Sequence, residues 1–337
     1  MDIRKIQMTG GSSYVLSLPK NWVRELGIKK NDLIGVVSRP DGTLLITPNI
    51  HYDNAAKVKE FSLKNYYDPD SLLRSLIGAY ISGFTIIKIT SAVRISPKVR
   101  QVVRNFTQMT IGQEVADETD NIIILKDILN PAEMPFGNTI RRMYVIVKSM
   151  HEDALSALEQ GKRELAEEVA SRDTDVDRLH WLIHRQFSLI TDNPSLALKM
   201  EITPREASTY YQISRIMERI GDHAVMIAES VLVLLDNNID ESLILRLTKT
   251  GERVLQIFNT VVQEIYSGSI SGANNIIDEA ASLETLLHSV SEMIGKMNAD
   301  ETVAVTQIVQ SIHRIGEYSI DIAEILINKL VADDPLC

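Results

Sequence analysis

The stretch that decides the fold is Glu218–His223, ERIGDH, which returns 95 residues later as His313–Tyr318, HRIGEY. Both copies run on into the same three letters, IAE, at Ile227–Glu229 and Ile322–Glu324. Apolar residues recur at helical spacing around each copy. Two diverged copies of one helical unit predict a pseudo-symmetric bundle.

Working outward, the pattern predicts helices over most of residues 138–331. A second offset of 107 residues aligns Gly161 with Gly268 and Asp177 with Glu284, and a longer loop in the first copy accounts for the difference. We therefore expect an all-α domain over 136–337, with three-helix repeats at about 138–236 and 240–331. Predicted breaks fall near Gly161, at 192–203, at 236–240, at 268–272 and at 298–300.

Acidic side chains recur along single faces of these helices. Residues at i, i+4, i+7 and i+11 lie within roughly 60° of one another around a helix axis. Carboxylates four residues apart repel each other, and a bound multivalent cation would compensate. The alternative, which stays open, is a solvated face neutralised by Arg178, Arg215, Arg219 and Arg314. The three stripes are Asp173, Asp177, His180 and His184; Glu218, Asp222 and Glu229; and His313, Glu317 and Glu324.

The second repeat is poorer in ligands. Ala280 stands where the first repeat has Asp173, which leaves Glu284 alone on that helix, although His313 and Glu317 remain ligand-capable. We expect a stronger metal site in the first repeat.

Residues 51–135 predict a separate small α/β segment. Asp68-Pro69 and Ser96-Pro97 each begin a helix, and strands are expected at 84–90, 113–115 and 122–125. We find no glycine-rich phosphate-binding motif there.

Residues 1–50 predict short strands around one helix that begins after Pro19 and ends at Gly27. Asp41-Gly42 between two apolar runs indicates a hairpin. A unit this small buries little surface, so we expect it to need a second copy. It carries seven Lys and Arg against four acids, whereas the chain's net charge is −10, which suggests an anionic polymer as a partner of this part.

The remaining features of the sequence bear on the cellular compartment of the protein. The N-terminus lacks the apolar core of a secretory signal, and no stretch of the 337 residues is long and apolar enough to span a membrane. The single cysteine, Cys337, allows no intrachain disulfide, so we expect a cytoplasmic protein.

The helix Met217–Glu229, MERIGDHAVMIAE, closely resembles the signature helix of the PhoU family. The resemblance implies an E(D)xxxD motif in each repeat and multinuclear metal clusters of iron or zinc, with manganese as a further candidate. Matching residues are Asp173 with Asp177 and Glu218 with Asp222, while His313 with Glu317 is a degenerate match. The family implies negative regulation of phosphate uptake and phosphate signalling, with transporter or signalling-kinase components as partners, including peripheral association with a membrane transporter.

The N-terminal segment IQMTGGSSYVLSLPKNWVRELGIKKNDLIGVV resembles AbrB-type swapped-hairpin domains. Asn31 stands where that family has Gly, and Asn tolerates the left-handed turn. The resemblance implies an intertwined homodimer that contacts DNA phosphates in a salt-dependent way. The residues carried over are Arg4, Lys5, Lys20 and Arg24.

The expected fold class is therefore α+β multidomain: a swapped-hairpin β domain at 1–50, an α/β segment at 51–135 and a PhoU-like bundle. The expected function is a phosphate-responsive regulator, not an enzyme, with DNA binding and transcription regulation through the N-terminal domain at 1–50. One alternative is a transporter or kinase partner that does not bind DNA. Another is a metal-dependent enzyme, although the paired Glu-x-x-His motifs of di-iron proteins and the common hydrolase signatures are absent.

Overall fold

The computed structural model describes residues 3–38, 42–48, 57–63, 68–237, 239–283 and 297–333. Asp41 of the expected hairpin turn, Glu284 and Cys337 lie outside these ranges. The chain divides into two compact units, Met1–Ala55 and Ala56–Cys337, and each is described separately below.

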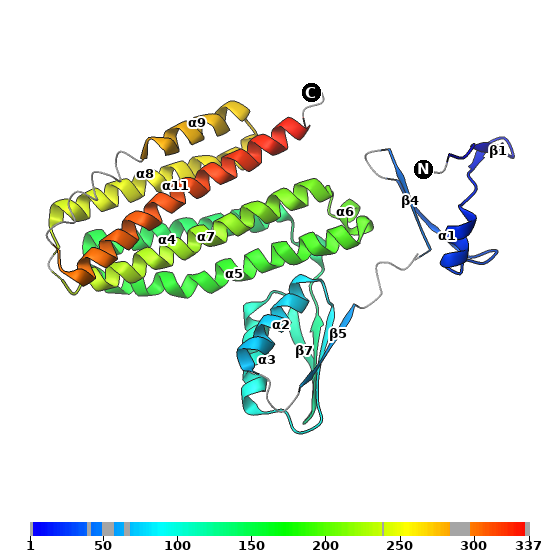
Figure 1. The fold of residues 1–337 in the computed structure, drawn as a ribbon, viewed down its shortest axis with the longest axis horizontal. Helices are drawn as coiled ribbons and strands as arrows, with labels where there is room; N and C mark the ends of the chain where they lie inside the picture. Colours follow the sequence, from blue (N-terminus) through cyan, green and yellow to red (C-terminus); the bar gives the residue numbers. More distant parts are fainter. Residues whose placement is uncertain are drawn as a thin grey trace. The chain divides into compact units, whose positions relative to one another are not determined.

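In its described residues, the first unit forms two small antiparallel sheets and one short helix (Figure 1). Asn31 adopts a φ of 74°, the left-handed conformation expected at that turn. None of the described residues of this unit is buried, and large apolar side chains such as Ile3, Tyr14 and Leu33 are exposed. The elements are β1 (Gln7–Thr9), β2 (Ser13–Val15), α1 (Lys20–Glu25), β3 (Gly35–Ser38) and β4 (Leu44–Thr47).

The second unit begins with a four-stranded sheet in the order β5-β6-β8-β7. Strands β5 and β6 are parallel, and the other two pairings are antiparallel. Helices α2 and α3 lie together beside the sheet (Figure 1) and share a buried core with its inner face. The elements are β5 (Val58–Leu63), α2 (Pro69–Ile81), β6 (Ile86–Ser91), α3 (Pro97–Met109), β7 (Gln113–Glu118) and β8 (Ile122–Asp127).

Local sequence explains where α2 and α3 begin. The side chains of Asp68 and Ser96 accept hydrogen bonds from the backbone N–H groups of Ser71 and Val99, and a proline follows each cap. Both helices were predicted with these starts. Strand β5 was not predicted, because its sequence VKEFSL has Lys and Glu at the second and third positions and lacks a clear apolar alternation.

The remaining chain is the predicted helical bundle. Gly161 and Gly268 end α4 and α8 in the left-handed conformation, with φ of 67° and 68°. The predicted break at 192–203 contains a short helix, α6, that the sequence analysis missed. After the short helix η1 (Pro131–Glu133), the elements are α4 (Phe136–Gln160), α5 (Arg163–Asp192), α6 (Pro194–Lys199), α7 (Pro204–Leu234), α8 (Glu241–Ser267), α9 (Ile270–Ala281) and α11 (Ala299–Asp333).

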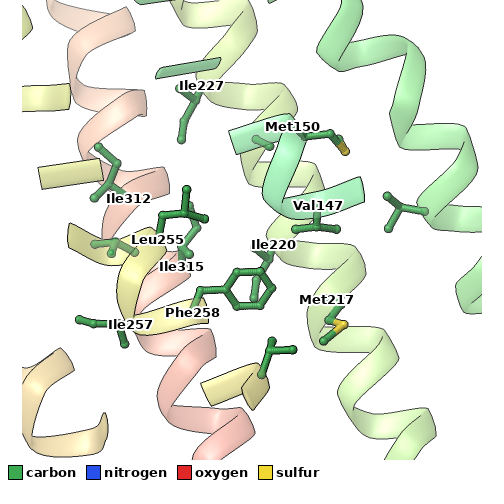
Figure 2. Close-up of a cluster of buried hydrophobic side chains, with 14 of the residues drawn as sticks. Val147, Met150, Met217, Ile220, Ile227, Leu255, Ile257, Phe258, Ile312 and Ile315 are labelled. Atoms are coloured by element: carbon green, nitrogen blue, oxygen red, sulfur yellow. The ribbon is translucent and has the colours of Figure 1, made fainter. Parts of the chain in front are cut away.

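The two repeats share one aliphatic core. Figure 2 shows Val147, Met150, Met217 and Ile220 from α4 and α7 converging with Leu255, Phe258 and Ile315 from α8 and α11. Polar contacts cross the same boundary, since the Tyr144 hydroxyl donates to Asn259 Oδ1 at 3.0 Å. The predicted α+β multidomain fold, with its bundle of two repeats, is confirmed.

A buried ion pair joins the α/β segment to helix α5. The side chain of Arg185 is 2% exposed and pairs with Asp127 at 2.5 Å. Its guanidinium also donates to the carbonyl oxygens of Tyr80 and Phe84 and lies 4.8 Å from the Tyr80 ring centroid. The amide of the neighbouring Gln186 donates to two carbonyl oxygens in the 131–134 turn. Helix α5 is therefore fixed to the sheet by polar contacts as well as by apolar packing.

None of the helices in the described ranges combines the length and the apolar character that a bilayer span requires.

Candidate metal centre

Helices α5 and α7 pack against each other and bring four predicted ligands together. Asp173 and Asp177 come from α5, and Glu218 and Asp222 come from α7. Gly221 lies between the last two, and a Cβ added there would be 3.5 Å from Val176 Cγ1 on α5. The two helices therefore approach closely beside the carboxylates.

The four carboxyl groups influence one another's titration. Burial, and then the charges of Asp173 and Asp222, raise the pKa of Asp177 to about 6. Burial, Asp222 and Asp177 raise the pKa of Glu218 to about 7, against a smaller opposing effect of Arg219. Burial is also the main cause of the raised pKa values of Asp173 and Asp222. Raised and mutually coupled pKa values show that negative charge is poorly compensated at this position.

The arginines that could neutralise these carboxylates are engaged elsewhere or do not pair with them. Arg178 pairs with Asp175 at 3.6 Å, and Arg314 pairs with Glu317 at 2.8 Å. Arg219 lies over the Tyr318 ring. Within the described ranges, none of the four first-repeat carboxylates forms an ion pair, and Asp173 Oδ1 is buried without a hydrogen-bond partner. The solvated, ion-paired alternative therefore fits the second repeat better than the first.

The side chains as they stand do not form a finished metal site. Across the part of the chain that the structure describes, no three His, Cys, Asp or Glu side chains converge at metal-binding distance. The four carboxylates form a loose, electrostatically coupled group, so side-chain rotation would be needed to close it around an ion.

Two family models match separate parts of the chain. The PhoU domain model matches residues 140–231, which contain all four carboxylates. The chain carries a PhoU domain. A second model, described as antidote-toxin recognition MazE, bacterial antitoxin, matches residues 7–51. Among curated proteins, no relative was found.

Solved structures show the same fold for the PhoU region. The chain is similar to PhoU from Pseudomonas aeruginosa, with 17% identity and a TM-score of 0.53, covering 59% of this chain and 96% of that one. It is also similar to the phosphate transport system regulatory protein PhoU from Streptococcus pneumoniae, with 18% identity and a TM-score of 0.50, covering 60% of this chain and 96% of that one. At these identities the likeness establishes the fold of the bundle.

The second repeat of the helical bundle presents a different surface. His313 and Glu317 lie on α11 with side chains 49% and 41% exposed, and their nearest atoms are 3.9 Å apart. Ala280, in the place of Asp173, is buried in the apolar core, and Glu284 lies outside the described residues. Glu229 and Glu324, at the ends of the predicted stripes, are exposed. The structure therefore does not bring His313 and Glu317 together with the four carboxylates of the first repeat.

The antitoxin-type domain keeps its predicted basic residues on the surface. All of Arg4, Lys5, Lys20 and Arg24 are exposed, and Arg4 Nη1 donates to Ser17 Oγ at 3.3 Å. Their exposed side chains form a basic surface on this domain.

The structure adds two groups of residues that the sequence analysis did not single out as a site. One is the Arg185–Asp127 junction, and its signal was an Arg-Gln pair inside the apolar run WLIHRQFSLI. The other surrounds His180 and His184, where His180 Nδ1 lies 3.0 Å from Ser214 Oγ. His180 and His184 were noted on the predicted stripe, but their partners on α7 are visible only in the fold.

Proposed function

We propose that this chain is a phosphate-responsive regulator that restrains phosphate uptake or phosphate signalling. The observation that carries the proposal is the group of four coupled carboxylates on α5 and α7 of a PhoU domain. We assign it a regulatory rather than a catalytic role in the cytoplasm, with components of a phosphate transporter or a signalling kinase as partners. Its contact with a transporter is peripheral.

The carboxylate group fits a metal ion. Asp173 Oδ1 is a buried oxygen without a partner, and each neighbouring carboxylate raises the cost of ionising the next. Asp173, Asp177, Glu218 and Asp222 would hold iron, zinc or manganese through oxygen ligands, and His313 with Glu317 would form a weaker site in the second repeat. Bound metal would supply positive charge and cross-link α5 to α7.

The N-terminal domain supports a role at DNA as a homodimer. A unit with no buried residue in its described part gains a core only by pairing, and large exposed apolar side chains offer the surface for it. Arg4, Lys5, Lys20 and Arg24 would then contact phosphates, which provide affinity more than sequence selection. Binding of DNA would let one chain join phosphate status to transcription.

The first test measures metal content and phosphate response in the same variants. Elemental mass spectrometry should find metal in the wild type and lose it in Glu218→Ala/Asp222→Ala. The control Glu164→Ala/Glu168→Ala removes an exposed pair of the same spacing from α5 and should keep the metal. In cells, the first variant should leave phosphate uptake high in phosphate-rich medium, and the control should not. Equal uptake in both variants would contradict the regulatory role.

A second test concerns DNA binding by the N-terminal domain. Binding of the full-length protein to duplex DNA should weaken steeply with salt, and Lys20→Ala/Arg24→Ala should reduce the slope of log K against log salt by about 2. Failure to bind any duplex at low salt would favour the transporter or kinase partner that does not contact DNA.

A further inference from the structure

Helix α5 carries a second set of metal-capable side chains beyond Asp173 and Asp177. His180 and His184 are four residues apart, so both imidazoles project from one side of the helix toward α7. Their ring centroids are 6.2 Å apart, and both rings lie near Tyr211 of α7. Two imidazoles at this spacing are a recurrent zinc-binding arrangement on helices.

Hydrogen bonds determine which nitrogen of His180 carries the proton. The Ser214 hydroxyl donates its single hydrogen to the carbonyl oxygen of Tyr211 at 2.8 Å. Toward His180 Nδ1, at 3.0 Å, this hydroxyl can therefore only accept. His180 thus bears its hydrogen on Nδ1, and Nε2 keeps a lone pair that bonds to no other described residue.

The Ser214 hydroxyl has the position that an outer partner has in known metal sites. A ligating histidine usually donates its second N–H to a neighbouring oxygen, which fixes the tautomer and the ring orientation. Here the chain His180 Nδ1–H to Ser214 Oγ–H to the Tyr211 carbonyl does both. The His180 residue is 9% exposed, and its ring is held in place before any ion arrives.

The surroundings also keep both imidazoles neutral, which is the form that binds metal. Burial, with smaller effects of His184 and Arg215, lowers the pKa of His180 to about 4. Burial and Arg215 lower the pKa of His184 as well. At neutral pH no proton has to leave either ring, although the Arg215 charge reduces the affinity for a cation.

Aromatic packing alone would account for the position of His184 but not for a free nitrogen. The Tyr211 ring is flanked by His184 at 4.3 Å and Phe187 at 5.3 Å between centroids. A phenylalanine at 184 would satisfy that stack equally well. Neither nitrogen of His184 bonds to a described residue, so its hydrogen-bonding capacity is unused in the fold.

We propose that His180 and His184 form a two-imidazole chelate for a borderline divalent transition ion such as Zn²⁺, with water completing the coordination. Nitrogen ligands favour such ions over Mg²⁺ or Ca²⁺. Two protein ligands are consistent with the absence of any convergent group of three in the described chain. The site uses no residue of the proposed carboxylate centre, so each can exist without the other.

The test uses full-length, metal-stripped protein and Zn²⁺ in competition with a chromophoric chelator. The variant His184→Phe keeps the ring stack and removes one ligand. The control is His223→Phe, because His223 is also half-buried and also has Nδ1 near a serine hydroxyl, Ser311 at 3.1 Å, but lacks a histidine four residues away. A third variant, Glu218→Gln/Asp222→Asn, removes charge from the carboxylate centre.

We expect His184→Phe to weaken Zn²⁺ binding at least about 10-fold, as loss of one of two ligands should. Electron spin-echo spectroscopy of the protein with one equivalent of Cu²⁺ should detect two imidazoles in the wild type and one in this variant. His223→Phe should leave both readouts unchanged. The carboxylate variant should lose the Zn²⁺ that the carboxylate centre holds and keep the signal of two imidazoles around Cu²⁺.

The outcomes separate the two sites. If His184→Phe binds Zn²⁺ and Cu²⁺ as the wild type does, the chelate does not exist. If the carboxylate variant loses all metal while His184→Phe keeps it, the chelate is refuted and the carboxylate centre stands. If only His184→Phe loses metal, the chelate stands and the carboxylate centre fails.

Discussion

Breaking the buried ion pair at the α5 junction should destabilise the protein far more than breaking an exposed one. Arg185 and Asp127 have side chains 2% and 6% exposed. Asp127→Asn keeps the size and an acceptor oxygen for the Leu129 N–H, which Asp127 Oδ1 now receives at 3.0 Å. It leaves the Arg185 charge buried with only neutral acceptors, which should cost about 3–5 kcal/mol of the free energy of unfolding.

The matched control is the exposed pair of Arg163 and Asp236, whose closest atoms are 2.6 Å apart with side chains 44% and 71% exposed. Solvent screens this pair, so Asp236→Asn should cost less than about 1 kcal/mol. Urea denaturation followed by circular dichroism at pH 7 measures both variants. Hydrogen exchange should show that protection falls first in α2 and β8 of Asp127→Asn, while α7 and α11 remain protected.

A cost below about 1 kcal/mol for Asp127→Asn would refute the reasoning, because the pair would then not be held in a dry site. A double-mutant cycle with Arg185→Met should give a coupling energy of about 1.5–3 kcal/mol, the range of hydrogen bonds to charged groups. Coupling near zero would mean that the junction is held by the carbonyl contacts and apolar packing alone.

Three further predictions concern the bundle and the sheet. The pKa of the Glu218 carboxyl is raised to about 7, so its ionisation lowers the free energy of unfolding of the metal-free protein as pH rises from about 4.5 through 7. Glu218→Gln should therefore stabilise the protein by about 1–2 kcal/mol at pH 8, a value discounted for solvent screening, and by little at pH 4.5. Urea titrations at the two pH values measure this difference. An unchanged difference across that range would contradict it. Gly112→Ala should lower the free energy of unfolding by more than about 2 kcal/mol, because φ of Gly112 is 90° and the new Cβ would lie 2.5 Å from Leu129 Cβ. Thermal unfolding measures this loss. Gly221→Ala, whose Cβ meets only ordinary contacts, should change the unfolding free energy by no more than the roughly 1 kcal/mol of helix propensity.

The features that could be predicted from the sequence are those whose interacting residues lie close together in the chain. The repeat at Glu218–His223 and His313–Tyr318 predicted the bundle, because side chains spaced by helical turns must share a face. The Asp-Pro and Ser-Pro pairs predicted the starts of α2 and α3, because a capping side chain and its N–H partner lie within three residues. These signals need no knowledge of the tertiary fold.

The missed features depend on partners far away in the chain. Strand β5 is an edge strand, so its outer residues need not be apolar, and only its pairing with β6 identifies it. Arg185 meets Asp127 across 58 residues of sequence, and no local pattern indicates that partner. The Ser214 hydroxyl that fixes the tautomer of His180 is on another helix for the same reason.

Helix α5 links the two parts of the second unit physically. Its Asp173 and Asp177 face α7, whereas Arg185, further along the same helix, pairs with Asp127 at the end of strand β8. The neighbouring Gln186 donates hydrogen bonds to the 131–134 turn. Asp173 and Arg185 are 12 residues apart, which is about 18 Å along a helix that rises 1.5 Å per residue. Any displacement of α5 relative to α7 must therefore either carry the sheet with the helix or break the Arg185 contacts. Since breaking them costs several kcal/mol, movement of the sheet together with α5 is the cheaper response.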